Sequence, residues 1–211
     1  MAMKQIAKGA EADLFLVTDW NGRRVIIKRR GLKKYRHPSL DYEIRRFRTI
    51  HEADILHRCK EAGVPSPLIY QVNPEKATIV MEYVEGEKIR DMVEYLEEEK
   101  KKTIFKIIGN QAGKLHSSSI IHGDLTTSNM IKSENRIVFI DFGLAEISDE
   151  IEKKGVDLNL MHRMLMSTHY RDKNLLLKSF IDGYTEVMGQ NAAAILDRMR
   201  EISTRGRYVE K

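Results

Sequence analysis

The stretch HGDLTTSNMIKSENRIVFIDFG, residues 122 to 143, is the most informative part of this chain. Asp141 and Asn129 offer the oxygen ligands that Mg²⁺ prefers when it bridges a protein to substrate phosphates. Two short strands predicted at 130–132 and 136–140 form a hairpin, whose two ends meet at one edge and bring Asn129 near Asp141. Asp124 precedes this hairpin, where a carboxylate can orient a hydroxyl or a water for in-line attack on a γ-phosphate. The stretch therefore predicts a site for a metal ion and a nucleoside triphosphate.

The part of the chain before residue 85 predicts a five-stranded antiparallel sheet. Alternating residues favour strands at 4–7, 13–18 and 23–28, and Asn21-Gly22 is a strong hairpin signal between the last two. Two more strands, 68–72 and 78–83, follow on either side of a turn at Asn73-Pro74. All five are short enough for a small sheet.

The third strand carries a candidate functional lysine. Val25 and Ile27 share one face of this strand, while Ile26 and Lys28 share the other, so Lys28 is expected beside an apolar wall. Gly9 lies in the turn before the second strand and is included among the expected nucleotide-binding residues. One glycine does not make a Gly-rich loop, so the prediction for Gly9 rests on its place in the chain.

A helix is predicted from Leu40 to Ala62, with Ser39 as its N-cap and Gly63 as its stop. Apolar residues at helical spacing are expected to face the sheet, namely Ile44, Phe47, Ile50 and Ala53. Glu52 lies beside this stripe rather than opposite it. Glu52 is therefore expected to reach inward to Lys28.

The second half of the chain is rich in helical patterns, which predicts an α+β fold with two lobes and a cleft between them. The expected boundaries are 1–84 for a lobe with the sheet and one helix, 85–203 for a helical lobe, and 204–211 for a basic tail. Helices are expected at 88–99, 103–118, 150–154, 157–167, 173–188 and 192–203. In the second of these helices the expected buried stripe is Ile104, Ile108, Ala112 and Leu115.

The composition favours a folded protein in a reducing compartment. The chain has 211 residues, and 42% of them are hydrophobic, which is enough for a substantial core. The single cysteine, Cys59, can form neither an internal disulfide nor a zinc cluster. The N-terminus lacks an apolar signal segment, and no apolar run approaches the roughly 20 residues of a membrane helix. A cytoplasmic protein without membrane contact is expected.

Positive charge is concentrated near the N-terminus. The formal net charge is +5, and residues 1 to 60 contain 15 Lys or Arg against 7 Asp or Glu. Such a segment is either a solvated surface or a binding surface for a polyanion, such as nucleotide phosphates, RNA or an acidic partner. The sequence pattern GxxxxGK[ST] is absent, which argues against a P-loop nucleotidase.

The motifs together resemble the protein kinase superfamily over nearly the whole chain. The matching features, in order, are the strand lysine, the helix glutamate, Met-Glu-Tyr-Val at 81–84, the HGD loop and the DFG tripeptide. The resemblance implies a minimal bilobal kinase fold that uses ATP and Mg²⁺. It implies that Lys28 binds the α- and β-phosphates and pairs with Glu52. It further implies that Asp124 is the catalytic base and that Asn129 and Asp141 hold Mg²⁺.

The same resemblance implies where the adenine ring binds. The backbones of Glu82 and Val84 are expected to contact the ring, and Met81 is expected to be the gatekeeper. Three isoleucines are expected to flank the ring, namely Ile26, Ile131 and Ile140. Asp157 is expected to brace the catalytic loop from the helix that follows.

Several departures from ordinary protein kinases narrow the family. Gly123 stands where those kinases carry arginine, and Thr126 stands where Ser/Thr kinases carry lysine. About 14 residues separate Gly143 from Asp157, and no Ala-Pro-Glu motif lies between them. The platform that binds peptide substrates is therefore mostly missing, which puts broad protein phosphorylation in doubt.

Four segments resemble the family of small atypical kinases of the KEOPS complex: GAEA at 9–12, KYRHP at 34–38, HGDLTTSN at 122–129 and RGRY at 205–208. This resemblance implies an autophosphorylating Ser/Thr kinase. Within the complex it is implied to hydrolyse ATP in support of threonylcarbamoyl-adenosine formation on tRNA. The implied partners are the threonylcarbamoyl-transferase subunit, a small adaptor subunit and, through the complex, tRNA.

Three alternatives remain open. A RIO-type atypical kinase also has a reduced substrate lobe, but tends to carry Ser-Glu-Tyr-Asn where this chain has Thr-Thr-Ser-Asn. A small-molecule phosphotransferase shares His-Gly-Asp, but needs helical insertions for which 211 residues leave little room. An inactive ATP-binding scaffold is the non-enzyme alternative, and the joint presence of Lys28, Asp124, Asn129 and Asp141 argues against it.

Overall fold

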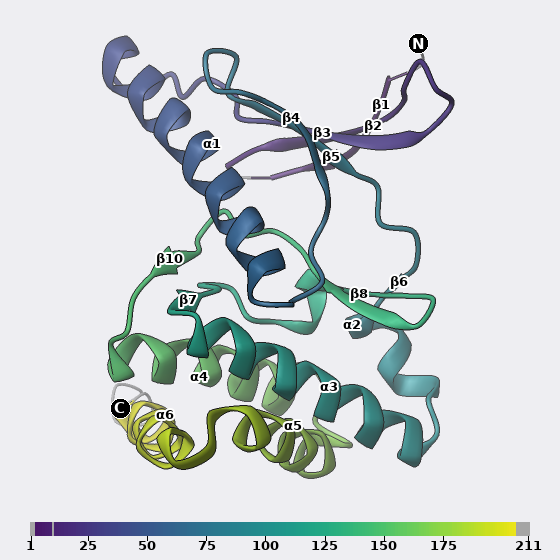
Figure 1. Ribbon diagram of the computed structural model, residues 1–211, viewed down its shortest axis with the longest axis vertical. Helices are drawn as coiled ribbons and strands as arrows, with labels where there is room; N and C mark the ends of the chain where they lie inside the picture. The colour runs from purple at the N-terminus through teal and green to yellow at the C-terminus, as the bar shows by residue number, and fades with distance from the viewer. Residues whose placement is uncertain (1–2, 10, 206–211) are drawn as a thin grey trace. The chain divides into compact units, whose positions relative to one another are not determined.

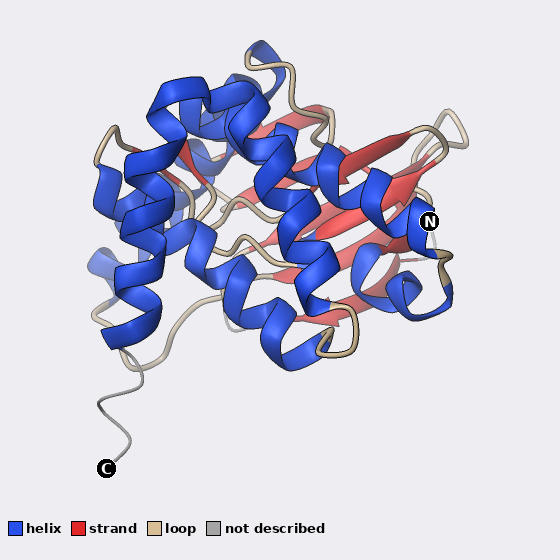
Figure 2. Ribbon diagram, turned by 90° about the horizontal axis from the view of Figure 1, so that it is seen from below, coloured by secondary structure: helices blue, strands red, loops and turns tan. Residues whose placement is uncertain are grey.

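The computed structural model describes residues 3–9 and 11–205, and the chain forms two units. Unit 1 comprises Met1–Arg58 and Ser66–Glu85, and unit 2 comprises Cys59–Pro65 and Gly86–Lys211. Unit 1 holds an antiparallel sheet beside one long helix, whereas unit 2 is mostly helical (Figures 1 and 2). The predicted α+β class is confirmed. Among the described residues, no helix combines the length and apolar character needed to span a bilayer.

The sheet of unit 1 has the five strands that were predicted, and their order is β1-β2-β3-β5-β4. Its strands are β1 Met3–Lys8, β2 Asp13–Thr18, β3 Arg24–Arg29, β4 Ile69–Asn73 and β5 Thr78–Glu82. The β2–β3 turn contains Gly22 at φ 78°, a backbone conformation that glycine adopts without steric cost. Asp19 stabilises the same turn, because its carboxylate accepts hydrogen bonds from the backbone N–H groups of Asn21 and Arg23, each 2.9 Å long.

The two faces of β3 differ as the alternation predicts. Val25 packs with Phe15 and Val17 in a buried cluster, against which Ile27 and Val80 also lie. Ile26 and Lys28 therefore belong to the opposite face of the strand. This arrangement turns the candidate lysine away from the apolar cluster.

The helix of unit 1, α1 Pro38–Glu61, buries a different face from the one predicted. Phe47 is 66% exposed and Ile50 is 42% exposed, so the expected apolar stripe does not cover the sheet. The buried side chains are instead Asp41, Thr49, Glu52, Ile55, Leu56 and Cys59, which repeat at helical spacing. Half of this inner face is polar because β3 presents charged side chains to it, which the apolar pattern of the helix does not reveal.

Unit 2 contains the remaining elements. In chain order these are β6 Glu87–Lys88, α2 Ile89–Met92, η1 Val93–Tyr95, α3 Glu98–Ser117, β7 Ile120–Ile121, η2 Thr127–Asn129, β8 Met130–Ser133, β9 Arg136–Phe139, β10 Glu146–Ile147, α4 Ile151–Thr168, α5 Lys173–Met188, η3 Gly189–Asn191 and α6 Ala192–Arg205. Strands β6, β8 and β9 form one small sheet, and β7 pairs with β10. The predicted hairpin between Asn129 and Asp141 is therefore present as β8 and β9.

The helix predicted at 88–99 is wrong. The chain makes only the single turn of α2 and the 3-10 turn η1, and then becomes extended at Leu96 with ψ 145°. Buried Ile89 and Val93 anchor these turns. Helix α3 begins at Glu98, five residues before its predicted start. The carboxylates of Glu98 and Glu99 in its first turn favour that start through the helix dipole.

Close helix packing explains how unit 2 tolerates internal glycines. The expected stripe on α3 is confirmed as buried, and α3 lies beside α5 (Figure 1). A Cβ at Gly109 would lie 2.0 Å from the carbonyl oxygen of Phe180, and one at Gly183 would lie 2.0 Å from that of Lys106. The two helices predicted at 150–154 and 157–167 form the single helix α4, in which Gly155 packs against Arg198 of α6.

Candidate nucleotide and metal site

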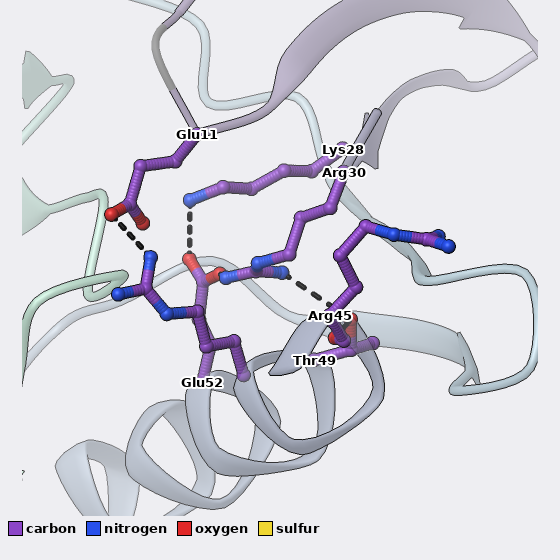
Figure 3. Close-up of polar contacts among 7 residues, drawn as sticks. Glu11, Lys28, Arg30, Arg45, Thr49 and Glu52 are labelled. Atoms are coloured by element: carbon purple, nitrogen blue, oxygen red, sulfur yellow. Dashed lines mark hydrogen bonds and ion pairs between the residues drawn. The ribbon is translucent and has the colours of Figure 1, made fainter. Parts of the chain in front are cut away.

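Unit 1 brings the predicted lysine and glutamate together. The ammonium nitrogen of Lys28 lies 2.6 Å from Oε1 of Glu52, and both side chains are buried (Figure 3). Glu52 comes from the polar half of the inner face of α1, and Lys28 comes from β3. A second cation, Arg30, reaches Oε2 of the same carboxylate at 2.5 Å. The expected contact between Lys28 and Glu52 is confirmed. The ion pair between Arg30 and Glu52 was not predicted.

The turn before β2 contains Gly9. Its backbone N–H donates a 3.0 Å hydrogen bond to the carbonyl of Ala12, and a Cβ at Gly9 would lie only 2.8 Å from that carbonyl oxygen. Glycine is thus required by a close backbone approach. Ala10 lies outside the described residues. Glu11, in the same turn, forms an ion pair with Arg48 of α1, which ties the turn to the helix.

Unit 1 carries four of the residues expected near adenine on β3, on β5 and just after β5: Ile26, Met81, Glu82 and Val84. Ile26 on β3 is the direct cross-strand partner of Met81 on β5. The N–H of Glu82 donates a 2.8 Å hydrogen bond to the carbonyl of Leu68 within unit 1. Val84, just past the strand, is only 7% exposed.

Unit 2 brings Asp124 and Asn129 together. The side-chain amide of Asn129 donates to the carbonyl of Asp124 at 3.0 Å and to its carboxylate Oδ2 at 2.8 Å. The backbone carbonyl of Asn129 accepts a 2.9 Å hydrogen bond from Ile140, the residue before Asp141. Ile131 lies on β8 opposite Val138 of β9. The hairpin thus places Asn129 beside the segment that carries Asp141, as predicted.

The donor set in unit 2 fits a magnesium ion. Because the amide nitrogen of Asn129 is committed to Asp124, its amide oxygen is the atom left to bind a cation. Asp141 has φ 61°, a left-handed backbone conformation that aspartate tolerates better than most residues. Among the described residues no group of three or more His, Cys, Asp or Glu side chains forms a metal cluster. Magnesium that is bound mainly by phosphates and water needs only one or two protein ligands.

The loop that carries the HGD motif, residues 122–124, is held by Asp157 of α4. Its buried carboxylate accepts hydrogen bonds from the backbone N–H groups of His122 at 2.8 Å and Gly123 at 2.9 Å, and from Nε2 of His116 at 3.2 Å. Burial by itself would raise the pKa of Asp157, but the hydrogen bond and charge of His116 outweigh it and lower the pKa. The carboxylate is therefore held ionised, in the bracing position expected for Asp157.

His122 is neutral and fills space under the loop. Its ring lies 4.6 Å from the ring of Phe142 and 6.1 Å from that of Phe139, between centroids. Complete burial lowers the pKa of His122 despite the nearby acidic groups. The Nδ1 atom accepts the N–H of Asp124 at 3.3 Å, so His122 helps to shape the loop.

A second set of contacts, made by Thr127, supports the segment that follows the HGD motif. The buried hydroxyl of Thr127, in η2, lies 3.1 Å from Nε2 of His169 and 3.2 Å from the sulfur of Met164. Burial lowers the pKa of His169, so its ring is neutral and pairs with the hydroxyl. His169 also lines a small surface pocket with Glu94 and residues 168–172.

Sequence reasoning missed three features of these sites: Arg30, the Glu11–Arg48 ion pair and the Thr127–His169 contact. Arg30 follows Lys28 by two residues, just after β3 ends at Arg29, so continuing the strand periodicity by one residue places both on one face. The Glu11–Arg48 and Thr127–His169 contacts join residues that are 37 and 42 positions apart, and no local sequence pattern predicts them.

Comparison with known proteins agrees with this geometry. The RIO domain family model matches residues 17–154. The KEOPS complex subunit Bud32 of Pyrococcus abyssi is 44% identical over 99% of this chain and 98% of its own length. A probable bifunctional tRNA threonylcarbamoyladenosine biosynthesis protein of Methanothermobacter thermautotrophicus is 42% identical over 97% of this chain, which spans only 36% of that relative.

Solved structures show the same fold. The Rio2 kinase of Chaetomium thermophilum, in an ADP/Mg²⁺-phosphoaspartate complex, superposes with a TM-score of 0.67 at 18% identity. The alignment covers 97% of this chain and 72% of that one. The predicted kinase resemblance is thereby confirmed, and the RIO alternative proves to belong to the same family. The chain is a member of the RIO-domain family of kinase-like enzymes, alongside the KEOPS subunit Bud32.

Proposed function

We propose that this protein is an ATP-dependent Ser/Thr kinase and ATPase, and that it acts as a subunit of a KEOPS complex. In that role it autophosphorylates, and it hydrolyses ATP in support of threonylcarbamoyladenosine formation on tRNA. The proposal rests on the family and on one structural observation. The Lys28–Glu52 pair and the Asp124–Asn129 pair are both assembled in one chain.

The role of each residue follows from its chemistry. Lys28, oriented by Glu52, supplies a point charge for the α- and β-phosphates of ATP. Asn129 and Asp141 hold Mg²⁺, which neutralises charge on the phosphates. Asp124, fixed by the amide of Asn129, orients the attacking hydroxyl or water. Support for this set comes from a protein of the same fold whose complex contains ADP and Mg²⁺.

The adenine contacts are proposed on the same basis. Glu82 and Val84 bind the base through their backbones, and Met81 limits the depth of the site. Gly9 lets the turn before β2 approach the nucleotide. The flanking residues are Ile26, Ile131 and Ile140, all of them half-buried.

We also propose the partners. The methanogen relative is named for tRNA threonylcarbamoyladenosine biosynthesis, and this chain matches about a third of it. The rest of such a protein leaves room for a transferase, so we expect a separate threonylcarbamoyl-transferase subunit to bind this chain, together with a small adaptor. Contact with tRNA is expected through the complex, in the cytoplasm. The division into lobes at 1–84 and 85–203 and a partner-binding tail at 204–211 belong to this proposal; residues 206–211 lie outside the described residues.

The decisive experiment measures ATP hydrolysis by the purified chain alone, with the transferase subunit, and with that subunit and tRNA. Hydrolysis should rise in the complex and should fall at least about 100-fold in Asp124→Asn, since the attacking group loses its orienting carboxylate. Asp197→Asn, an exposed carboxylate on α6 in the same unit, is the control. The proposal would be refuted if the rate of ATP hydrolysis were the same with and without the partners and the same in Asp124→Asn as in the unmodified protein. Transfer of phosphate to a small molecule instead would favour the phosphotransferase alternative.

A further inference from the structure

Two buried cations share one buried carboxylate in unit 1. Oε1 of Glu52 faces Lys28 at 2.6 Å, and Oε2 faces Arg30 at 2.5 Å (Figure 3). Arg30 also lies 3.5 Å from the hydroxyl of Thr49, one turn before Glu52 on α1. The exposed fractions of Lys28, Arg30 and Glu52 are 7%, 3% and 2%. All three side chains therefore interact with little screening by solvent.

Lys28 and Arg30 contact different oxygens of Glu52, so they constrain its carboxylate in different ways. A carboxylate held at one oxygen can still rotate about its last side-chain bond, because that torsion is broad. Holding the second oxygen fixes the plane of the group. A guanidinium suits this purpose because it is planar and its donors have fixed directions, whereas an ammonium is a point charge on a flexible stem.

We propose that Arg30 is a positioning residue for Lys28, acting through Glu52. By holding Oε2, Arg30 keeps Oε1 directed at Lys28, and so keeps the ammonium group where it is needed. The position of Glu52 is then set by the sheet side of unit 1 as well as by α1, because Arg30 directly follows the last residue of β3. The inference rests on the proposed function, since Lys28 is taken to bind nucleotide phosphates.

The competing explanation is a structural role, in which the stem of Arg30 only fills space between β3 and α1. The two explanations differ when Glu52 is altered. A positioning residue loses its effect once Glu52 no longer holds Lys28, whereas a space-filling residue matters equally in both backgrounds. A double-mutant cycle measures this difference directly.

The experiment uses the full chain and the variants Arg30→Met, Glu52→Gln and the double variant. Its kinetic readout is the kcat and KM of Mg-ATP hydrolysis, and melting temperatures are recorded in parallel. We expect Arg30→Met to lower kcat/KM for ATP by about 10-fold or more, the usual effect of losing a charged hydrogen bond. In the Glu52→Gln background the same change should alter kcat/KM by less than about 3-fold. Arg30→Lys should restore part of the loss, since it keeps the charge.

A second readout does not depend on ATP turnover. The rate at which an amine-acylating reagent labels Lys28 is measured in the nucleotide-free protein by mass spectrometry. Labelling should rise several-fold in Arg30→Met and stay unchanged in the control Arg58→Met, which alters an exposed arginine on α1, the helix that carries Glu52. In the Glu52→Gln background, Arg30→Met should add no further increase.

Each outcome decides one question. Unchanged labelling in Arg30→Met, or equal losses of kcat/KM in both backgrounds, overturns the positioning role of Arg30. Increased labelling that depends on Glu52 supports it, even in a preparation that does not turn over ATP. Absence of turnover in the unmodified protein and in its complex would refute the proposed function alone.

Discussion

Replacement of Asp157 by asparagine should weaken unit 2 at the base of the catalytic loop. The carboxylate accepts three hydrogen bonds, of 2.8, 2.9 and 3.2 Å, and its side chain is fully buried. Asparagine keeps one acceptor oxygen but turns an N–H₂ group toward one of the donors. Hydrogen bonds to a charged group contribute about 1.5–3 kcal/mol each, so the loss of one, with a donor left unpaired, predicts a cost of about 3 kcal/mol.

The pH dependence of this cost has a definite sign. The pKa of Asp157 is lowered in the folded protein, so its carboxylate contributes stability above the unfolded pKa of about 3.9, and that contribution is lost as the pH falls through the folded value. Urea unfolding of both proteins, followed by circular dichroism, should therefore show the full difference at pH 7 and a shrinking difference below about pH 4.

Asp197→Asn, in an exposed ion pair on α6, should change stability by less than about 0.5 kcal/mol. A loss below about 1 kcal/mol for Asp157→Asn at pH 7 would refute the bracing role. A difference that stays constant below pH 4 would refute the assignment of an ionised carboxylate.

Two further substitutions test the loop. Gly123→Ala should cost more than about 3 kcal/mol, because the residue has φ 78° and a Cβ would lie 2.3 Å from the carbonyl oxygen of Leu144. Gly22→Ala has the same φ with open space around it and should cost only about 1–2 kcal/mol, so equal melting temperatures for the two would contradict the predicted clash. Thr127→Val keeps the shape of the side chain but removes the hydroxyl that pairs with His169. The free energy of unfolding in urea should fall by about 1–2 kcal/mol, and ATP turnover should slow. If neither quantity changed, the Thr127–His169 contact would not support the loop.

Features set by local chemistry could be predicted from the sequence. The Asn21-Gly22 turn and the alternation of β2 and β3 determine the start of the sheet and the face that carries Lys28. The hairpin between Asn129 and Asp141 follows in the same way. Each of these features depends on the turn and strand preferences of a few neighbouring residues, so the local sequence is enough to predict it.

Features set by tertiary contacts could not be predicted in this way. The inner face of α1 is polar where Thr49 and Glu52 meet Lys28 and Arg30. The spacing of apolar residues along the helix therefore predicts the wrong buried face, the exposed stripe that includes Phe47. In the same way, the helices predicted at 150–154 and 157–167 are one helix, α4, and the close contact of Gly155 with Arg198 of α6 inside it is a tertiary feature.

We propose that Asp141 and Asn129 hold Mg²⁺ for a bound ATP. The most direct test is Mg²⁺-dependent ATP hydrolysis by Asp141→Asn, chosen because asparagine tolerates the left-handed backbone at this position. We expect turnover to fall at least about 100-fold, while the melting temperature and metal-free nucleotide binding remain close to those of the unmodified protein. Full Mg²⁺-dependent turnover in the purified variant would contradict it.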